Sequence, residues 1–115
     1  MNADYEKSRL LALTTVHADQ FTDEFVDWLP DNMHVWDAFV AEAQKVRARG
    51  FKRYSARTII HFLRHHTAVA EASNTGWKVN NNHSPYMARL FDLRYPSMAG
   101  MWEYRITKAV GAAAA

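Results

Sequence analysis

The sequence contains no cysteine, which excludes disulfide bonds, thiolate nucleophiles and cysteine-ligated zinc sites. Its four glycines form no glycine-rich phosphate loop. No apolar run approaches the ~20 residues that a membrane-spanning helix needs, and the first residues do not resemble a secretory signal. We therefore expect no membrane contact and, by default, a cytoplasmic location.

Residues arranged for catalysis are also missing. Ser55 and Ser84 are better explained as helix caps than as nucleophiles, and no Ser/His/Asp order stands out. The carboxylates Asp23 and Asp27 lie at a predicted helix start, where they interact with the helix dipole. We therefore predict that the protein is not an enzyme and needs no cofactor.

What the chain does have is enough apolar surface for one core. It has 115 residues, of which 49% are hydrophobic and 13% aromatic, so it is not of a disordered composition. We predict a single domain over residues 1–111, with residues 1–20 as a peripheral helix and 112–115 as a disordered alanine tail. The four tryptophans are expected to lie mainly in the core.

Charge is divided unevenly along the chain. Residues 1–44 contain nine acidic and two basic residues, a net charge of −7, whereas residues 45–115 contain three acidic and twelve basic residues, a net charge of +9. The total is the formal +2 of the whole chain. Such a division favours a polyanionic partner for the basic part. The alternative is that the acidic segment packs beside the basic one and neutralises it.

Apolar spacing and capping residues predict five helices, over residues 4–17, 22–29, 33–49, 56–70 and 84–94. Thr22, Asn32, Ser55 and Ser84 are the expected N-caps, and Gly50 is expected at the C′ position directly after the third helix. The side chains predicted to be buried on the last three helices are Trp36, Phe39, Val40, Ala43, Val46, Ile59, Phe62, Leu63, His66, Ala70, Met87, Leu90 and Phe91.

Two short segments alternate like strands, namely residues 77–79 and 101–107. The predicted fold class is therefore mainly α (α+β): a helical N-terminal part followed by a winged-helix-like helix-strand-helix-strand unit. The connection over residues 71–83 is longer than the tight turn of a standard helix-turn-helix.

Two groups of residues favour nucleic-acid binding. Basic side chains are concentrated over residues 47–64 with no acidic residue among them, and the helix start at Ser55 can also hold a phosphate. A second group surrounds the polar run 80–83, although asparagines there can equally bond to their own backbone. The predicted nucleic-acid-binding residues are Arg53, Arg57, Arg64, Lys78, Asn81, Tyr86 and Arg89.

Histidines raise the question of a metal site. His61 and His65 are four residues apart on one predicted helix, a spacing that can bind a metal. However, Phe62 occupies the position at which the zinc-protease motif has glutamate, and no further ligand is evident in the sequence apart from His83. We therefore predict no metal site, with His61 and His65 as surface residues and His66 as a partly buried one.

The stretch from about Phe25 to Arg105 resembles a group of small proteins encoded by bacteriophages and prophages, which have no settled function. The resemblance covers about 80 of the 115 residues. It is carried by the runs 32–36, 50–57, 63–64, 77–82 and 88–91, by Pro96, and by residues 102–105. It implies a host-cell setting in which small proteins bind DNA or inactivate a host protein, and it identifies no catalytic residues.

The sequence thus predicts a small phage-encoded, winged-helix-like DNA-binding protein with a regulatory role, whose partner is duplex DNA. A homodimer is compatible with this prediction. The alternative is an interaction protein that inhibits a host enzyme or defence complex through its acidic helical face. The partner-binding residues would then be Asp23, Glu24 and Asp27.

Overall fold

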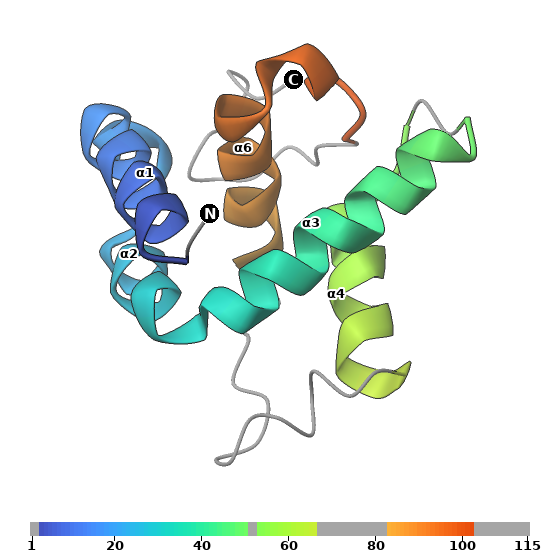
Figure 1. Ribbon diagram of the computed structural model, residues 1–115, viewed down its shortest axis with the longest axis horizontal. Helices are drawn as coiled ribbons and strands as arrows, with labels where there is room; N and C mark the ends of the chain where they lie inside the picture. The colour runs from blue at the N-terminus through green and yellow to red at the C-terminus, as the bar shows by residue number, and fades with distance from the viewer. Residues whose placement is uncertain (1–2, 51–52, 67–82, 103–115) are drawn as a thin grey trace.

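The computed structural model describes residues 3–50, 53–66 and 83–102, and in these ranges the chain is helical. The helices, shown in Figure 1, are α1 (Ala3–Val16), α2 (Asp23–Trp28), α3 (Met33–Ala48), α4 (Ala56–His66) and α6 (Ser84–Arg94). Short 3₁₀ turns join or follow them: η1 (Ala18–Gln20), η2 (Leu29–Asn32) and η4 (Pro96–Met98).

Local sequence explains most of the helix boundaries. The hydroxyl of Thr22 accepts a hydrogen bond from the amide of Phe25 at 3.2 Å, and the hydroxyl of Ser55 accepts one from the amide of Thr58 at 3.3 Å, as predicted for two N-caps. Gly50 follows α3 at φ +93°, a conformation that side chains with a Cβ rarely adopt.

The structure differs from the prediction at two other caps. Asn32 occupies the N-cap position of α3, as predicted, but makes no capping bond; its side-chain amide donates to the carbonyl of Trp28 at 2.7 Å, because η2 continues almost directly into α3. At the start of α6 the cap position belongs to His83, and Ser84 is already the first helical residue. The two helices nonetheless begin within one residue of where the sequence places them, since Pro85 suits a first turn.

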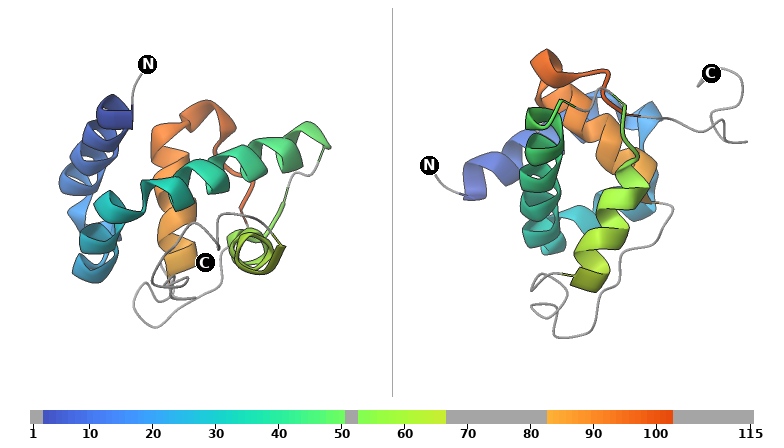
Figure 2. Two further views of the ribbon diagram at one scale, coloured as in Figure 1. Left: turned by 60° about the horizontal axis from the view of Figure 1, so that its bottom comes forward. Right: turned by 90° about the vertical axis from the view of Figure 1, so that its right-hand side faces the viewer.

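Helix α6 lies between the two ends of the molecule, as Figures 1 and 2 show. Helices α1 and α2 lie at one end, α4 lies at the other, and α3 crosses the front of α6. Helix α4 packs on both α3 and α6, and α1 packs on α6. Among the described residues, the resulting core contains nineteen buried apolar side chains.

Aromatic rings fill the centre of this core. Phe39 of α3 stacks on Trp36 and on Trp102, with ring centroids 6.0 and 5.3 Å apart, and meets Phe91 of α6 edge-on at 6.3 Å. Phe91 in turn meets Trp102 at 5.4 Å. These rings join three segments that are far apart in the sequence, so the buried apolar surface holds the ends of the domain together.

An ion pair attaches α1 to α6. The guanidinium of Arg94 donates from Nε and Nη2 to the carboxylate of Glu6 at 2.9 to 3.1 Å, and both side chains are about four-fifths buried. The hydrogen bond to Glu6 raises the pKa of Arg94 above its usual range, so the guanidinium stays charged. This pair and buried Leu10 hold the predicted peripheral helix against the body.

The predicted winged-helix unit is wrong, whereas the mainly α character is confirmed. Within the described ranges there is no strand, only one parallel bridge between Tyr54 and Trp102, where the amide of Tyr54 donates to the carbonyl of Met101 at 2.7 Å. Met101 and Trp102 are both buried, so the segment does not alternate between core and solvent as a half-buried strand does. Residues 103–107 and the predicted strand at 77–79 lie outside the described residues.

Candidate nucleic-acid interface

Helix α4 is more strongly amphipathic than α1, α3 and α6. Its buried side consists of Ala56, Ile59, Ile60 and Leu63, all at most 5% exposed. This spacing of three, four and seven residues is one face of a helix. The prediction that Phe62 is buried is wrong: its side chain is 39% exposed, because the contact with both α3 and α6 turns Ile60 inward in its place.

The outer side of α4 carries basic residues. Arg57 is exposed and Arg64 is half-buried, and their seven-residue spacing places them on one side of the helix. Arg53, also exposed, precedes the helix by three residues. Helix α4 contains no Asp or Glu, and within the described ranges neither Arg53 nor Arg57 has an ion-pair partner. We call Arg53, Arg57 and Arg64 the α4 basic face.

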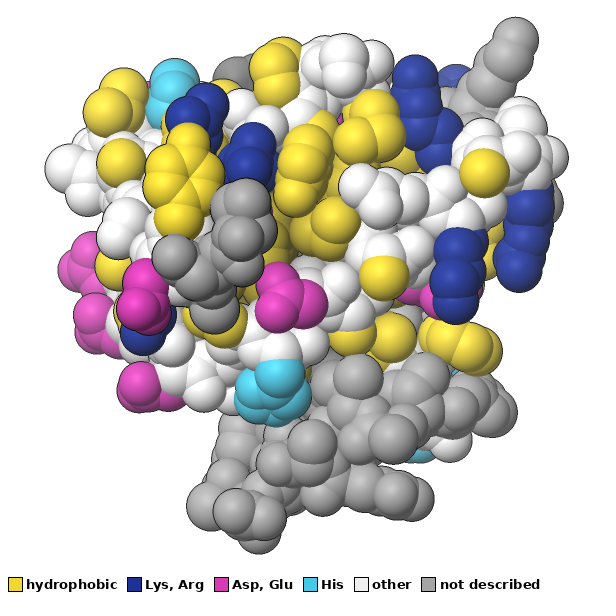
Figure 3. All heavy atoms as spheres, viewed as in Figure 1, with side chains coloured by type: hydrophobic (Ala, Val, Ile, Leu, Met, Phe, Trp, Pro, Cys, Tyr) yellow, Lys and Arg dark blue, Asp and Glu magenta, His cyan; other side chains and the backbone are white. Residues whose placement is uncertain are grey.

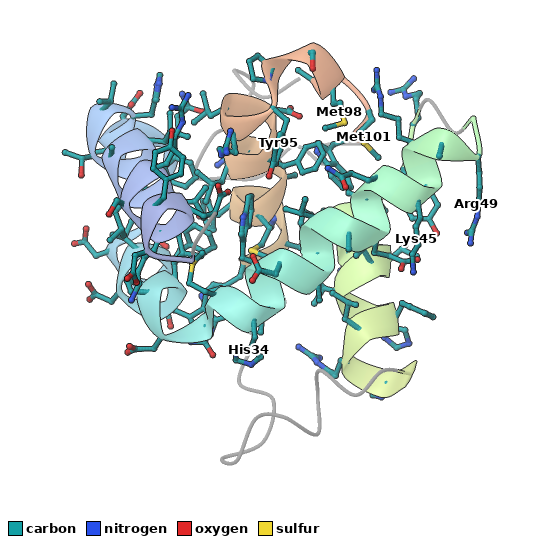
Figure 4. The ribbon with its side chains drawn as sticks, in the orientation of Figure 1. His34, Lys45, Arg49, Tyr95, Met98 and Met101 are labelled. Atoms are coloured by element: carbon teal, nitrogen blue, oxygen red, sulfur yellow. The ribbon has the colours of Figure 1, made fainter. Side chains whose placement is uncertain are left out.

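The end of α3 adds positive charge beside α4. Lys45 and Arg49 point outward from the C-terminal part of α3 (Figure 4), and dark blue side chains gather along this edge of the molecule in Figure 3. Lys45 forms a long ion pair with Glu42 at 3.9 Å, while Arg47 donates to the carbonyls of Ser97 and Met98. Arg49 is therefore the residue of this group most accessible to an anion.

Two of the predicted contacts do not join this face. Arg89 donates to the carbonyl of Gln20 at 3.2 Å and lies over the ring of Tyr86, so it is turned toward the α1–α2 end of α6. Tyr86 is half-buried, with its ring 5.7 Å from that of Phe25. The sequence expects both side chains to point outward, but α1 and α2 cover that side of α6. Lys78 and Asn81 lie outside the described residues.

The acidic residues form a separate surface. Five exposed carboxylates lie on η1, α2 and η2, at the end of the molecule opposite α4; Figure 3 shows acidic side chains along that edge. They are Asp19, Asp23, Glu24, Asp27 and Asp31, here called the α2 acidic face. None of them is in an ion pair within the described ranges. Among the described residues, the two halves are joined by the ion pairs Glu6–Arg94 and Glu42–Lys45, and the α2 acidic face takes part in neither.

A buried histidine packs against α2. His83 is 3% exposed, and its ring lies 5.0 Å from that of Trp28 and 5.5 Å from that of Phe25. Neither of its ring nitrogens has a hydrogen-bond partner among the described residues. Burial lowers the pKa of His83, and the nearby charge of Glu24 opposes this only in part. His83 therefore stays neutral in the folded protein to a lower pH than an exposed histidine.

This burial predicts that stability decreases in mild acid. Because the pKa of His83 is lowered by folding, the unfolded chain binds a proton more readily, and stability is lost as pH falls below about 6.5. A single proton limits the slope to about 1.4 kcal/mol per pH unit. We expect urea titrations at about pH 8 and about pH 5.5 to give a larger decrease in unfolding free energy for the wild type than for His83→Phe. Equal decreases in the two proteins would contradict this assignment.

Other kinds of site find no support in the described residues. No three His, Asp or Glu side chains in those ranges lie close enough together to hold a metal ion. No helix among them is both long and apolar enough to cross a lipid bilayer. A comparison with protein-family models, curated proteins and solved structures found no match to this chain. The case for a function therefore depends on the charge and exposure of its side chains.

Proposed function

We propose that this protein binds duplex DNA through the phosphates, using the α4 basic face. The observation that carries the proposal is the exposure of Arg53 and Arg57 beside a helix that has no carboxylate. A guanidinium without a carboxylate partner is available to a phosphate, which it binds through two parallel hydrogen bonds.

The dimensions of α4 suit such a contact. A helix rises about 1.5 Å per residue, so Arg57 and Arg64 are about 10 Å apart along the axis. They can therefore contact separate phosphates of one duplex, whose charges are spaced far more closely. Lys45 and Arg49 point outward from the C-terminal part of α3 and add positive charge at that end of the molecule. Contacts of this kind supply affinity and position without base specificity.

The winged-helix geometry forms no part of this proposal, since α4 is followed by no described wing. The resemblance to small phage-encoded proteins supports a regulatory role in an infected cell as part of the same proposal. The resemblance indicates only the cellular setting, since the proposed DNA contacts depend on the side chains of α4.

A salt titration of duplex binding tests the proposal. Each phosphate contact adds about 0.9 to the slope of log affinity against log salt. Three arginine contacts predict a slope of about −3, measured by fluorescence anisotropy with a labelled duplex of random sequence. The absence of detectable binding at about 50 mM salt would overturn the proposal.

A second candidate is a host protein bound by the α2 acidic face. It is favoured by five exposed carboxylates with no ion-pair partner in the described ranges. A face that carries charge of one sign attracts a partner surface of the opposite sign. Reversing the charge of Asp23, Glu24 and Asp27 should abolish this partner and leave duplex binding in place, so the two candidates depend on different residues.

A further inference from the structure

Two histidines lie side by side on the outer side of α4. The rings of His61 and His65 have centroids 4.5 Å apart and are tilted by 51°. Both side chains are exposed. Arg57 precedes His61 by four residues and Arg64 follows His61 by three, so both arginines lie on the same side of the helix as His61. The histidine pair therefore lies within the α4 basic face.

The surroundings of this pair are rich in positive charge. On α4 itself the charged residues are Arg57 and Arg64, and there is no carboxylate. The elements packed against α4 are α3 and α6, which contact its opposite, apolar side. Their ionisable side chains are His34, Asp37, Glu42, Lys45, Arg47, Tyr86, Arg89, Asp92 and Arg94. Of the carboxylates in this group, Glu42 is paired with Lys45.

We propose that His61 and His65 are phosphate-binding residues in their protonated form, so that the affinity for DNA rises as pH falls. The inference rests on the proposed function and adds two residues and a proton dependence to it. An imidazolium donates from both ring nitrogens, and imidazole changes charge between about pH 8 and pH 5.

Electrostatics gives the direction of the effect. A phosphate placed over the pair attracts a proton added to either ring, because opposite charges a few ångströms apart favour each other. DNA binding therefore draws protons onto the histidines, and by linkage added protons strengthen DNA binding.

A metal ion is the competing occupant of the same pair. Two histidines four residues apart can chelate a divalent cation, but the flanking arginines repel a cation and attract an anion. The charge of the surrounding face therefore favours phosphate. The described residues provide no third ligand at the pair.

The experiment measures duplex affinity at about pH 6 and about pH 8 at constant salt, a range in which the phosphodiesters do not titrate. We expect the wild type to bind about tenfold more tightly at the lower pH. The slope of log affinity against log salt should then be steeper by about 0.9 to 1.8, which corresponds to one or two additional phosphate contacts. The double variant His61→Gln/His65→Gln should lose this difference and keep its affinity at the higher pH.

The matched control is His17→Gln/His34→Gln, which removes two histidines outside α4 and should behave as the wild type. Circular dichroism at both values of pH checks that protonation of the buried His83 has not unfolded the protein. Failure of the inference is distinct from failure of the proposed function. If duplex binding requires Arg57 but is equally tight at both values of pH, or if the control loses the difference as well, the histidines do not bind phosphate. If no duplex binding occurs at any pH, the proposed function itself fails.

Discussion

Replacing Arg53 and Arg57 together by glutamate is expected to weaken duplex binding by about 100-fold at about 100 mM salt. The change removes two guanidinium groups and places two carboxylates against the phosphates. Both side chains are exposed and form no ion pair in the described ranges, so the fold should be unaffected. Fluorescence anisotropy across a salt series should also give a slope about two units shallower than that of the wild type.

The control for this prediction changes the net charge by the same amount at the other end of the molecule. Lys7→Glu/Arg9→Glu alters α1, which does not belong to the α4 basic face, and should cost less than about threefold. If both double variants lose affinity equally, binding reflects only the total charge of the protein, and the assignment of the contacts to α4 is wrong.

Replacing Phe39 by alanine is expected to have the largest effect on stability. Phe39 is fully buried and contacts the rings of Trp36, Phe91 and Trp102, so its removal leaves a cavity where three segments meet. Losing a buried phenylalanine costs about 3–5 kcal/mol, a large part of the about 5–15 kcal/mol that stabilises a typical domain. Urea denaturation followed by tryptophan fluorescence measures the loss.

Phe62→Ala is the matched control, because it makes the same chemical change on the outer side of α4. Its side chain is 39% exposed, and we expect a cost of about 1 kcal/mol or less. If the two variants were equally destabilised, the core would not be centred on the aromatic rings around Phe39.

Local chemistry explains which parts of the fold could be predicted. Thr22 and Ser55 cap helices because a hydroxyl one position before a helix can accept an orphan amide hydrogen. Gly50 ends α3 because it adopts positive φ without strain. The apolar stripe of α3 is buried as expected, except that Val40 is only partly so. These features depend on neighbours in the sequence, which is why they can be recognised without a structure.

The errors lie where tertiary contacts decide. Alternation over residues 101–107 resembles a strand, yet Met101 and Trp102 are both buried, and the ring of Trp102 packs on Phe39 of α3 and Phe91 of α6. Phe62 and Ile60 differ by two positions on one helix, and the sequence cannot tell which of them a second neighbouring helix will cover. The sequence predicts that Arg89 points outward, but in the structure its guanidinium donates to the carbonyl of Gln20.

The sequence by itself determined that the chain lacks cysteine chemistry, forms mainly helices and carries opposite charges in its two parts. These properties follow from composition and short-range pattern. Only the tertiary structure decided that the two charges face opposite ends of the molecule, that Arg57, Arg64 and the histidine pair share the outer side of α4, and that Arg89 leaves that group. The physical reason is that a side chain's exposure depends on which helices pack against its own, and those helices lie tens of residues away along the chain.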